Sequence, residues 1–112
     1  MAGKLTTHAL DVSRGAGAAG LEVTVRRPSG PALASARLDD HGRATLLAEG
    51  LERGLYEIVF EAAAYHRSAG VVLSEPPFLD RITIAFGVSD PEAHYHVPLL
   101  LSPYSYSTYR GS

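Results

Sequence analysis

Short runs of alternating apolar and polar residues, separated by turn signals at near-regular spacing, constrain the fold of this chain most tightly. The run from 21 to 27 alternates leucine and valine with polar residues, and the run from 81 to 88 alternates isoleucine, phenylalanine and valine with smaller or polar residues. A period of two is typical of strands with one buried and one solvated face. Turn-forming segments such as Pro28-Ser29-Gly30-Pro31 separate these runs. The pattern predicts an all-β chain.

The turn signals divide the chain into seven to eight predicted strands and one helix. We predict strands over residues 5–12, 21–27, 33–38, 43–47, 55–60 and 81–88. One further strand precedes Ser102-Pro103 and another follows it. The predicted helix spans residues 61–67, which have high helix propensity and are followed by Gly70. Such a set of elements is typical of a two-sheet β-sandwich. Pro98 lacks a ladder donor, so its strand must bulge, break or turn its unpaired side outward.

Length and composition limit the partners that this chain can have. With 112 residues it forms a single domain, residues 1–112, with room for a modest core but not for a deep pocket. A site of any depth therefore needs a partner subunit. Ten Lys plus Arg against twelve Asp plus Glu give a net charge of −2 without a basic stripe, which argues against nucleic acid as a partner.

The chain shows no sign of export or membrane insertion. Cysteine is absent, which excludes a nucleophilic thiol and leaves the redox compartment open. No apolar run approaches the ~18 residues of a membrane span, and no apolar stretch follows Lys4 as a signal peptide requires. We expect a cytoplasmic protein with no membrane partner.

The end of the sequence is unusually rich in tyrosine and closes on Tyr109-Arg110-Gly111-Ser112. Chain ends are normally poorly ordered unless other residues hold them. A strand-like run that continues to the last residue is therefore expected to pack, with its carboxylate put to use. We expect these residues to line a site.

Histidine is the residue best suited to proton transfer near neutral pH, and the chain has five. On the residues alone, His8 is typical of a partly buried strand histidine and Arg43 of a solvated arginine. His94 and His96 share one face of a strand, and with His8 they could form a zinc centre with an open position for water. Metal-binding histidines usually have carboxylate partners, however, and that strand contains no Asp or Glu.

Three blocks of the sequence resemble one enzyme family. Residues 94–112, HYHVPLLLSPYSYSTYRGS, are similar to the C-terminal signature of the 5-hydroxyisourate hydrolases, transthyretin-like enzymes of urate breakdown. Residues 5–11 resemble the N-terminal block of that family and residues 40–43 its central turn, in the family's order and spacing. The resemblance implies an eight-stranded transthyretin-like β-sandwich with one short helix. It also implies a homotetramer, a dimer of dimers with active sites at the dimer-dimer interface.

The same resemblance implies a reaction and a set of residues. The expected reaction is hydrolysis of 5-hydroxyisourate, a purine-derived small molecule, to 2-oxo-4-hydroxy-4-carboxy-5-ureidoimidazoline, with neither metal nor cofactor. The implied catalytic residues are His8, Arg43 and His96. The implied substrate-binding residues are His8, Arg43, Ser112 and Tyr109. A planar guanidinium suits Arg43 to bidentate contact with the carbonyls or the anion of the substrate ring.

Other functions remain open at this point. Transthyretin shares the fold and carries hormone without catalysis, although it lacks the histidine and arginine trio and the closing Tyr-Arg-Gly-Ser. A zinc hydrolase and a plain adhesive sandwich domain are further alternatives. We expect His94 to be structural, and the role of His41 is open because the family more often has a small polar residue there. Thr6 and Thr7 are the neighbours expected to orient His8 by hydrogen bonding.

Overall fold

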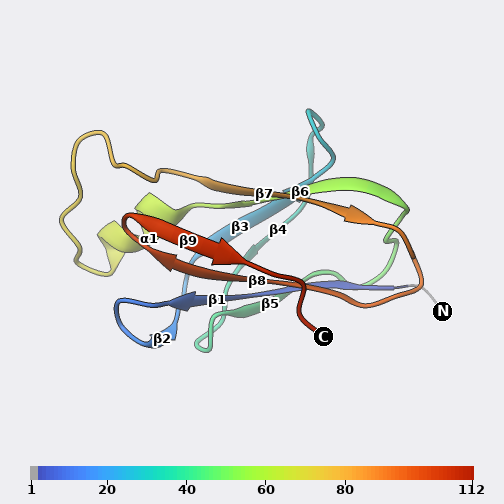
Figure 1. Cartoon of the computed structure of the whole chain (residues 1–112), viewed down its shortest axis with the longest axis horizontal. Helices are drawn as coiled ribbons and strands as arrows, with labels where there is room; N and C mark the ends of the chain where they lie inside the picture. The colour runs from blue at the N-terminus through green and yellow to red at the C-terminus, as the bar shows by residue number, and fades with distance from the viewer. Residues whose placement is uncertain (1–2) are drawn as a thin grey trace.

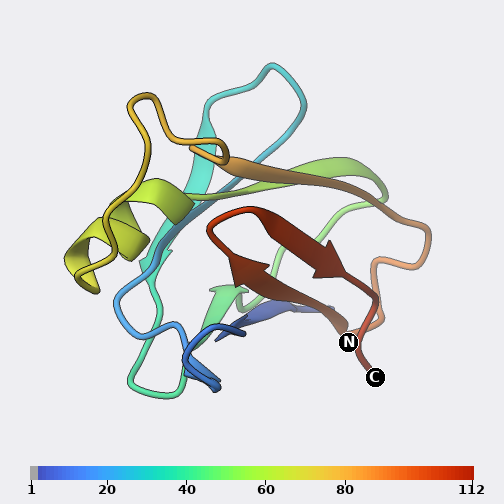
Figure 2. The same ribbon diagram turned by 60° about the vertical axis from the view of Figure 1, so that its left-hand side comes forward.

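A computed structural model describes residues 3–112, which form nine strands and one short helix in two facing sheets. Figures 1 and 2 show the two layers, with the helix at one end of the sandwich. The elements are β1 (Leu5–Asp11), β2 (Ala16–Gly17), β3 (Glu22–Arg26), β4 (Ala32–Arg37), β5 (Arg43–Leu47), β6 (Gly54–Phe60), α1 (Ala62–Ser68), β7 (Ile82–Val88), β8 (Tyr95–Ser102) and β9 (Ser105–Thr108). The predicted β-sandwich is confirmed.

The additional strand is β2, in a segment for which the sequence predicted only a break. Its two residues pair with the end of β1, Leu10 opposite Gly17 and Asp11 opposite Ala16. The chain reverses through Gly15, whose φ of 66° is readily adopted by glycine. So short a pairing has no alternating pattern from which it could be predicted.

The two sheets differ in how they bring distant parts of the chain together. The first sheet has the order β2-β1-β8-β9, with β5 also paired to β1, and the second has the order β4-β3-β6-β7. Strands β1 and β8 are parallel, from Leu5 opposite Tyr95 to Asp11 opposite Leu101. Strand β5 runs antiparallel along the other edge of β1. Residues near positions 6, 43 and 96 therefore become neighbours in one sheet.

Burial alternates along the first sheet, as its period of two predicts. In β1 the side chains of Leu5, Thr7, Ala9 and Asp11 are buried, whereas those between them are half-buried. The inward residues join one apolar core with buried residues of the second sheet, among them Val23, Val25, Ile58 and Phe60. Thr6, His8 and Leu10, which alternate with these buried residues, consequently lie on the outer face of the first sheet.

Pro98 ends the pairing of β8 with β9 without ending β8 itself. The parallel ladder with β1 continues through it, His8 opposite Pro98. The Pro98 carbonyl accepts a hydrogen bond from Thr108 Oγ1 (2.6 Å), so the missing N–H also faces the β9 side. Strand β9 stops there at Thr108, and pairing resumes where Gly111 N donates to His96 O (2.8 Å). This bridge holds the last residues of the chain against β8.

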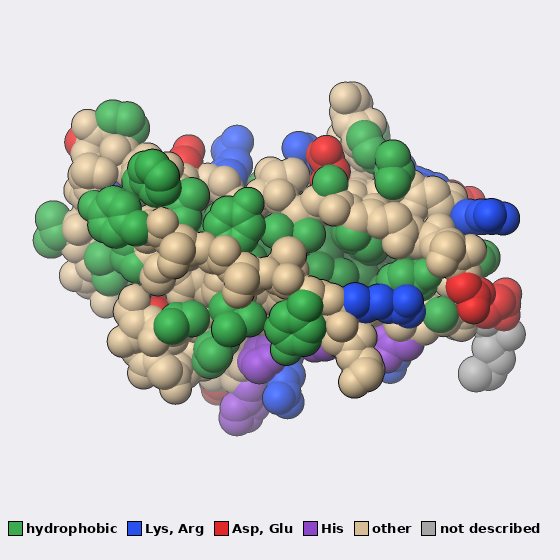
Figure 3. Space-filling model, in the orientation of Figure 1, with side chains coloured by type: hydrophobic (Ala, Val, Ile, Leu, Met, Phe, Trp, Pro, Cys, Tyr) green, Lys and Arg blue, Asp and Glu red, His purple; other side chains and the backbone are tan. Residues whose placement is uncertain are grey.

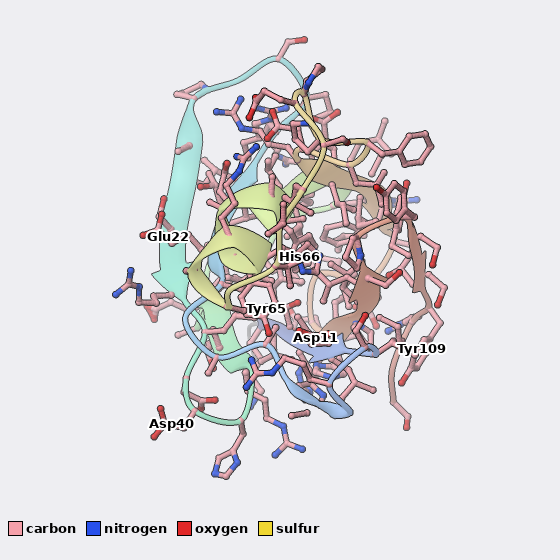
Figure 4. The ribbon with its side chains drawn as sticks, turned by 90° about the vertical axis from the view of Figure 1, so that its left-hand side faces the viewer. Asp11, Glu22, Asp40, Tyr65, His66 and Tyr109 are labelled. Carbon is pink, nitrogen blue, oxygen red and sulfur yellow. The ribbon has the colours of Figure 1, made fainter. Side chains whose placement is uncertain are left out.

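Helix α1 begins and ends one residue later than predicted and covers one end of the core. Its buried face includes Tyr65 and His66. Tyr65 donates its hydroxyl to the buried carboxylate of Asp11 (2.7 Å), and Figure 4 shows these three residues between helix and sheet. Within residues 3–112 no helix is long and apolar enough to cross a membrane.

Candidate active site

A cavity of about 460 Å³ opens on the outer face of the first sheet. Residues of β1, β5 and β8 line it together with Ser112, and they include His8, Arg43 and His96. Figure 3 shows histidine side chains and neighbouring Lys or Arg side chains along the lower edge of the molecule, where β1 and β5 lie. The structure thus brings His8, Arg43, His96 and Ser112 to one cavity, as the resemblance implied.

Strand register explains why these residues meet. His8 lies opposite Arg43 in the antiparallel pair of β1 and β5. Thr6 lies opposite His96 in the parallel pair of β1 and β8. Cross-strand neighbours project from the same face of a sheet and lie within reach of each other. Two adjacent pairs on β1 therefore place two imidazoles and one guanidinium on a single surface.

His96, like His8, is only partly exposed on the outer face of the first sheet. Its ring is half-buried, and its Nδ1 lies 2.7 Å from Thr6 Oγ1. Burial is the main cause that lowers the pKa of His96, and electrostatic repulsion from His94, His8 and Arg43 lowers it further. The neutral imidazole, which can accept a proton, is therefore the favoured form near neutral pH.

The turn between β4 and β5 positions His8 and Arg43 together. His8 Nε2 donates to the backbone carbonyl of His41 (3.1 Å). The carboxylate of Asp39 accepts from the backbone N–H groups of His41 and Arg43, both at 2.9 Å. These two hydrogen bonds are the main causes that lower the pKa of Asp39. Gly42, with a φ of 78°, completes the turn.

His41 contacts His8 through this turn. Its contact with His8 runs through the backbone carbonyl, which any residue supplies, and its side chain is exposed. The expectation that threonines orient His8 is wrong. Thr6 bonds to two other histidines, and Thr7 donates to Val97 O (2.8 Å) because its side chain faces the core.

The side chain of Arg43 lines the cavity. Its side chain is exposed, and within residues 3–112 the guanidinium forms no hydrogen bond or ion pair. By contrast, Arg26 is paired with Glu57 at 3.0 Å and Arg27 with Glu52 at 3.3 Å. A guanidinium without a protein partner is available to an anionic or carbonyl-bearing ligand.

Residues among the last four of the chain line two different cavities. Ser112 lines the cavity. Tyr109 and Arg110 line a separate hollow of about 290 Å³ beside β7, where the Arg110 guanidinium lies 4.1 Å from the centre of the Tyr95 ring. Figure 4 shows Tyr109 at the right-hand edge of the molecule, beyond Asp11 and His66. A direct contact between Tyr109 and substrate stays a prediction.

Sequence reasoning missed Asp39 and expected Thr6 to bond to the wrong histidine. Thr6 joins His94 and His96, and Asp39 holds the turn that carries Arg43. Thr6 and His8 are two positions apart on β1, so the sequence pattern places both on the same face of the sheet. The pattern does not show which residues Thr6 contacts there. His94, expected to be structural, lines the cavity and bonds to Thr6 at 2.7 Å.

Metal-binding arrangements were among the alternatives for these histidines. Among residues 3–112, no three His, Cys, Asp or Glu side chains form a group that could hold a metal ion. One ring nitrogen of His94 and one of His96 instead contact the Thr6 hydroxyl.

Known proteins resemble the chain over almost its whole length. Residues 5–111 match the model of the HIUase/Transthyretin family. The chain is 47% identical over 116 residues to 5-hydroxyisourate hydrolase 2 of Rhizobium meliloti (strain 1021), and the aligned region covers 98% of this chain and 97% of that protein. The structure of Klebsiella pneumoniae 5-hydroxyisourate hydrolase has a TM-score of 0.84 and 37% identity, over 97% of this chain and 99% of that one.

A carrier of the same fold is also similar. Sea bream transthyretin in complex with thyroxine matches with a TM-score of 0.83 and 26% identity, over 96% of this chain and 93% of that one. The sequence identity to the hydrolases is the higher of the two. On the family match and the identity to its relatives, this chain belongs to the HIUase/Transthyretin family.

Proposed function

We propose that this protein hydrolyses 5-hydroxyisourate to 2-oxo-4-hydroxy-4-carboxy-5-ureidoimidazoline in urate degradation. The observation that carries the proposal is the convergence of His8, Arg43, His96 and Ser112 on one cavity. Relatives at 47% to 50% identity, which bear the name 5-hydroxyisourate hydrolase, support it.

The chemistry needs a base, an anion-stabilising group and a proton for the leaving nitrogen. In the proposed mechanism neutral His96 takes a proton from water, and the water oxygen bonds to the ring carbonyl carbon. Arg43 stabilises the oxyanion that forms. The carbon–nitrogen bond then breaks, the six-membered ring opens, and the nitrogen takes up a proton. His8 shares this proton transfer, and Ser112 helps to hold substrate and water.

The cavity lies on the outer face of a sheet, so one chain leaves it open on one side. A second layer of protein would exclude water and strengthen every charge contact in the site. We therefore propose a homotetramer, a dimer of dimers that places the cavities at the dimer-dimer interface. The proposed reaction uses no metal or cofactor, and the proposed location is the cytoplasm.

The carrier function is the second candidate, because sea bream transthyretin has the same fold. A carrier binds its ligand and releases it unchanged. Turnover of substrate therefore separates the two functions.

The test follows the ultraviolet absorbance of freshly generated 5-hydroxyisourate with and without the protein. We expect faster decay with the wild type, and loss of most of this acceleration in Arg43→Ala because the oxyanion then lacks its cation. The matched control is Arg37→Ala, an exposed arginine on β4 that pairs with Glu22 at 3.5 Å, and it should keep the wild-type rate. A wild type that gives no acceleration contradicts the proposal.

A chelator tests the zinc alternative in the same experiment. The metal-free mechanism predicts the same rate after treatment with chelator and removal of the metal complex. Loss of activity that added zinc restores would favour the zinc hydrolase instead.

A further inference from the structure

Thr6 lies at the centre of the histidine cluster, although it takes no part in the proton transfers described above. Its Oγ1 is 2.7 Å from His96 Nδ1 and 2.7 Å from His94 Nε2. The residue is half-buried on β1 and faces the cavity. One hydroxyl therefore joins two imidazoles.

The number of available protons restricts how these three groups can bond. A hydroxyl has one donor and accepts through its lone pairs, and a neutral imidazole has one donor nitrogen and one acceptor nitrogen. Thr6 can donate to only one ring, so at least one ring must donate to Thr6. If His96 donates from Nδ1, its Nε2 is left as an acceptor. If Thr6 donates to His96, Nε2 carries the proton and cannot act as a base.

The second nitrogen of His96 is the one that can meet a substrate. Thr6 contacts Nδ1 of His96. The backbone of Gly111 packs against the opposite edge of the ring, so closely that a Cβ atom added to Gly111 would lie 2.5 Å from His96 Cδ2. The ring is thus held on both edges. Because burial lowers the pKa of His96, its neutral form predominates and the tautomer decides what Nε2 does.

We propose that Thr6 is a positioning residue that accepts a hydrogen bond from His96 Nδ1–H, donates its own proton to His94 Nε2, and so keeps His96 Nε2 as the proton acceptor. His94 turns the hydroxyl proton away from His96. The consequence for catalysis rests on the proposed function, in which His96 takes a proton from water. The tautomer itself is a property of the resting protein and can be measured without substrate.

Nitrogen-15 NMR of the histidine-labelled protein measures this tautomer directly. In the wild type we expect a protonated His96 Nδ1 and an unprotonated Nε2. Thr6→Val should move both signals toward the Nε2–H tautomer, and Thr6→Ser, which keeps the hydroxyl, should retain the wild-type signals. A wild-type His96 with its proton on Nε2 overturns the proposal, as do unchanged signals in Thr6→Val. The wild-type spectrum decides even if Thr6→Val does not fold.

Kinetics test the catalytic consequence. For Thr6→Val we expect kcat to fall about 10-fold with KM within about twofold, well short of the roughly 10²- to 10⁴-fold loss of a general base. Thr6→Ser, which keeps the hydroxyl, should have the kcat of the wild type. The matched control is Thr24→Val on the other sheet, whose Oγ1 lies 3.3 Å from Ser35 Oγ. An unchanged kcat in Thr6→Val overturns the proposal. A wild type with the expected tautomer but no hydrolysis refutes the proposed function alone.

Discussion

His96 in the cavity and His66 beneath α1 show how one residue type serves two regions of the molecule differently. Burial lowers the pKa of both side chains. His96 has Thr6 at one ring nitrogen and lines a cavity. His66 is 1% exposed, and within residues 3–112 neither of its ring nitrogens has a side-chain hydrogen-bond partner. A lowered pKa therefore does not by itself identify a catalytic histidine.

The surroundings of the two histidines explain the difference. Three strands converge around His96 with polar groups that face the same surface. His66 packs among core residues, and its polar neighbours are paired with each other: Tyr65 donates to Asp11 (2.7 Å), and Arg14 donates to Tyr65 (3.3 Å). Accordingly, we expect changes near His96 to affect activity and changes near His66 to affect stability.

The largest effect is expected for His96→Asn. Removal of the proposed general base should lower kcat/KM by about 10²- to 10⁴-fold, while the free energy of unfolding changes little because the ring lies on the outer face. Decay of 5-hydroxyisourate and urea denaturation at one fixed protein concentration measure the two quantities. A variant that keeps the wild-type rate removes His96 from the mechanism.

The pH dependence of the wild type is the next largest effect. The proposed base works only when His96 is neutral, and its pKa lies below the ordinary value of about 6.5. Hence kcat/KM should be level above that pH and should fall about tenfold per pH unit once the pH drops below the lowered pKa. A profile that already declines from pH 7.5 to 6.5 would contradict this assignment.

Tyr65→Phe should affect stability and leave activity intact. The variant leaves the buried carboxylate of Asp11 without the Tyr65 hydroxyl, a loss of about 1–3 kcal/mol in the free energy of unfolding. The matched control is Tyr104→Phe, because Tyr104 is 64% exposed and keeps its ring contact with Phe78. Equal midpoints of urea denaturation for the two variants would disprove the role of this hydrogen bond.

The smallest effect is expected for His66→Phe, and it should appear on acidification. The unfolded state binds a proton at His66 below about pH 6.5, whereas the folded state resists protonation because burial lowers the pKa. The unfolding free energy of the wild type therefore falls as the pH drops below 6.5 toward the folded pKa. The variant lacks His66 and so does not lose the part of the stability that its protonation removes. The unfolding free energy of the variant minus that of the wild type should therefore increase from pH 7 to pH 5, since Asp11 and Tyr65 are common to both proteins. Parallel curves would contradict the prediction.

The sequence predicted the strands well because inward and outward residues alternate along them. It could not predict which strands pair, so the contact of Thr6 with His94 and His96, which joins residues about 90 positions apart, had no signature in the pattern. The candidate residues His8, Arg43 and His96 came from the family resemblance, since each is ordinary in its local context. Asp39 escaped notice because turn aspartates are common. Roles assigned from the resemblance remain predictions until they are measured.

One NMR titration can separate the two histidine environments in the intact protein. An unreactive purine-like inhibitor is added while the imidazole signals of all five histidines are followed. We expect the signals of His8 and His96 to shift together with inhibitor concentration and the signal of His66 to stay in place. Saturable binding that leaves His8 and His96 unshifted would show that the substrate site lies elsewhere on the molecule.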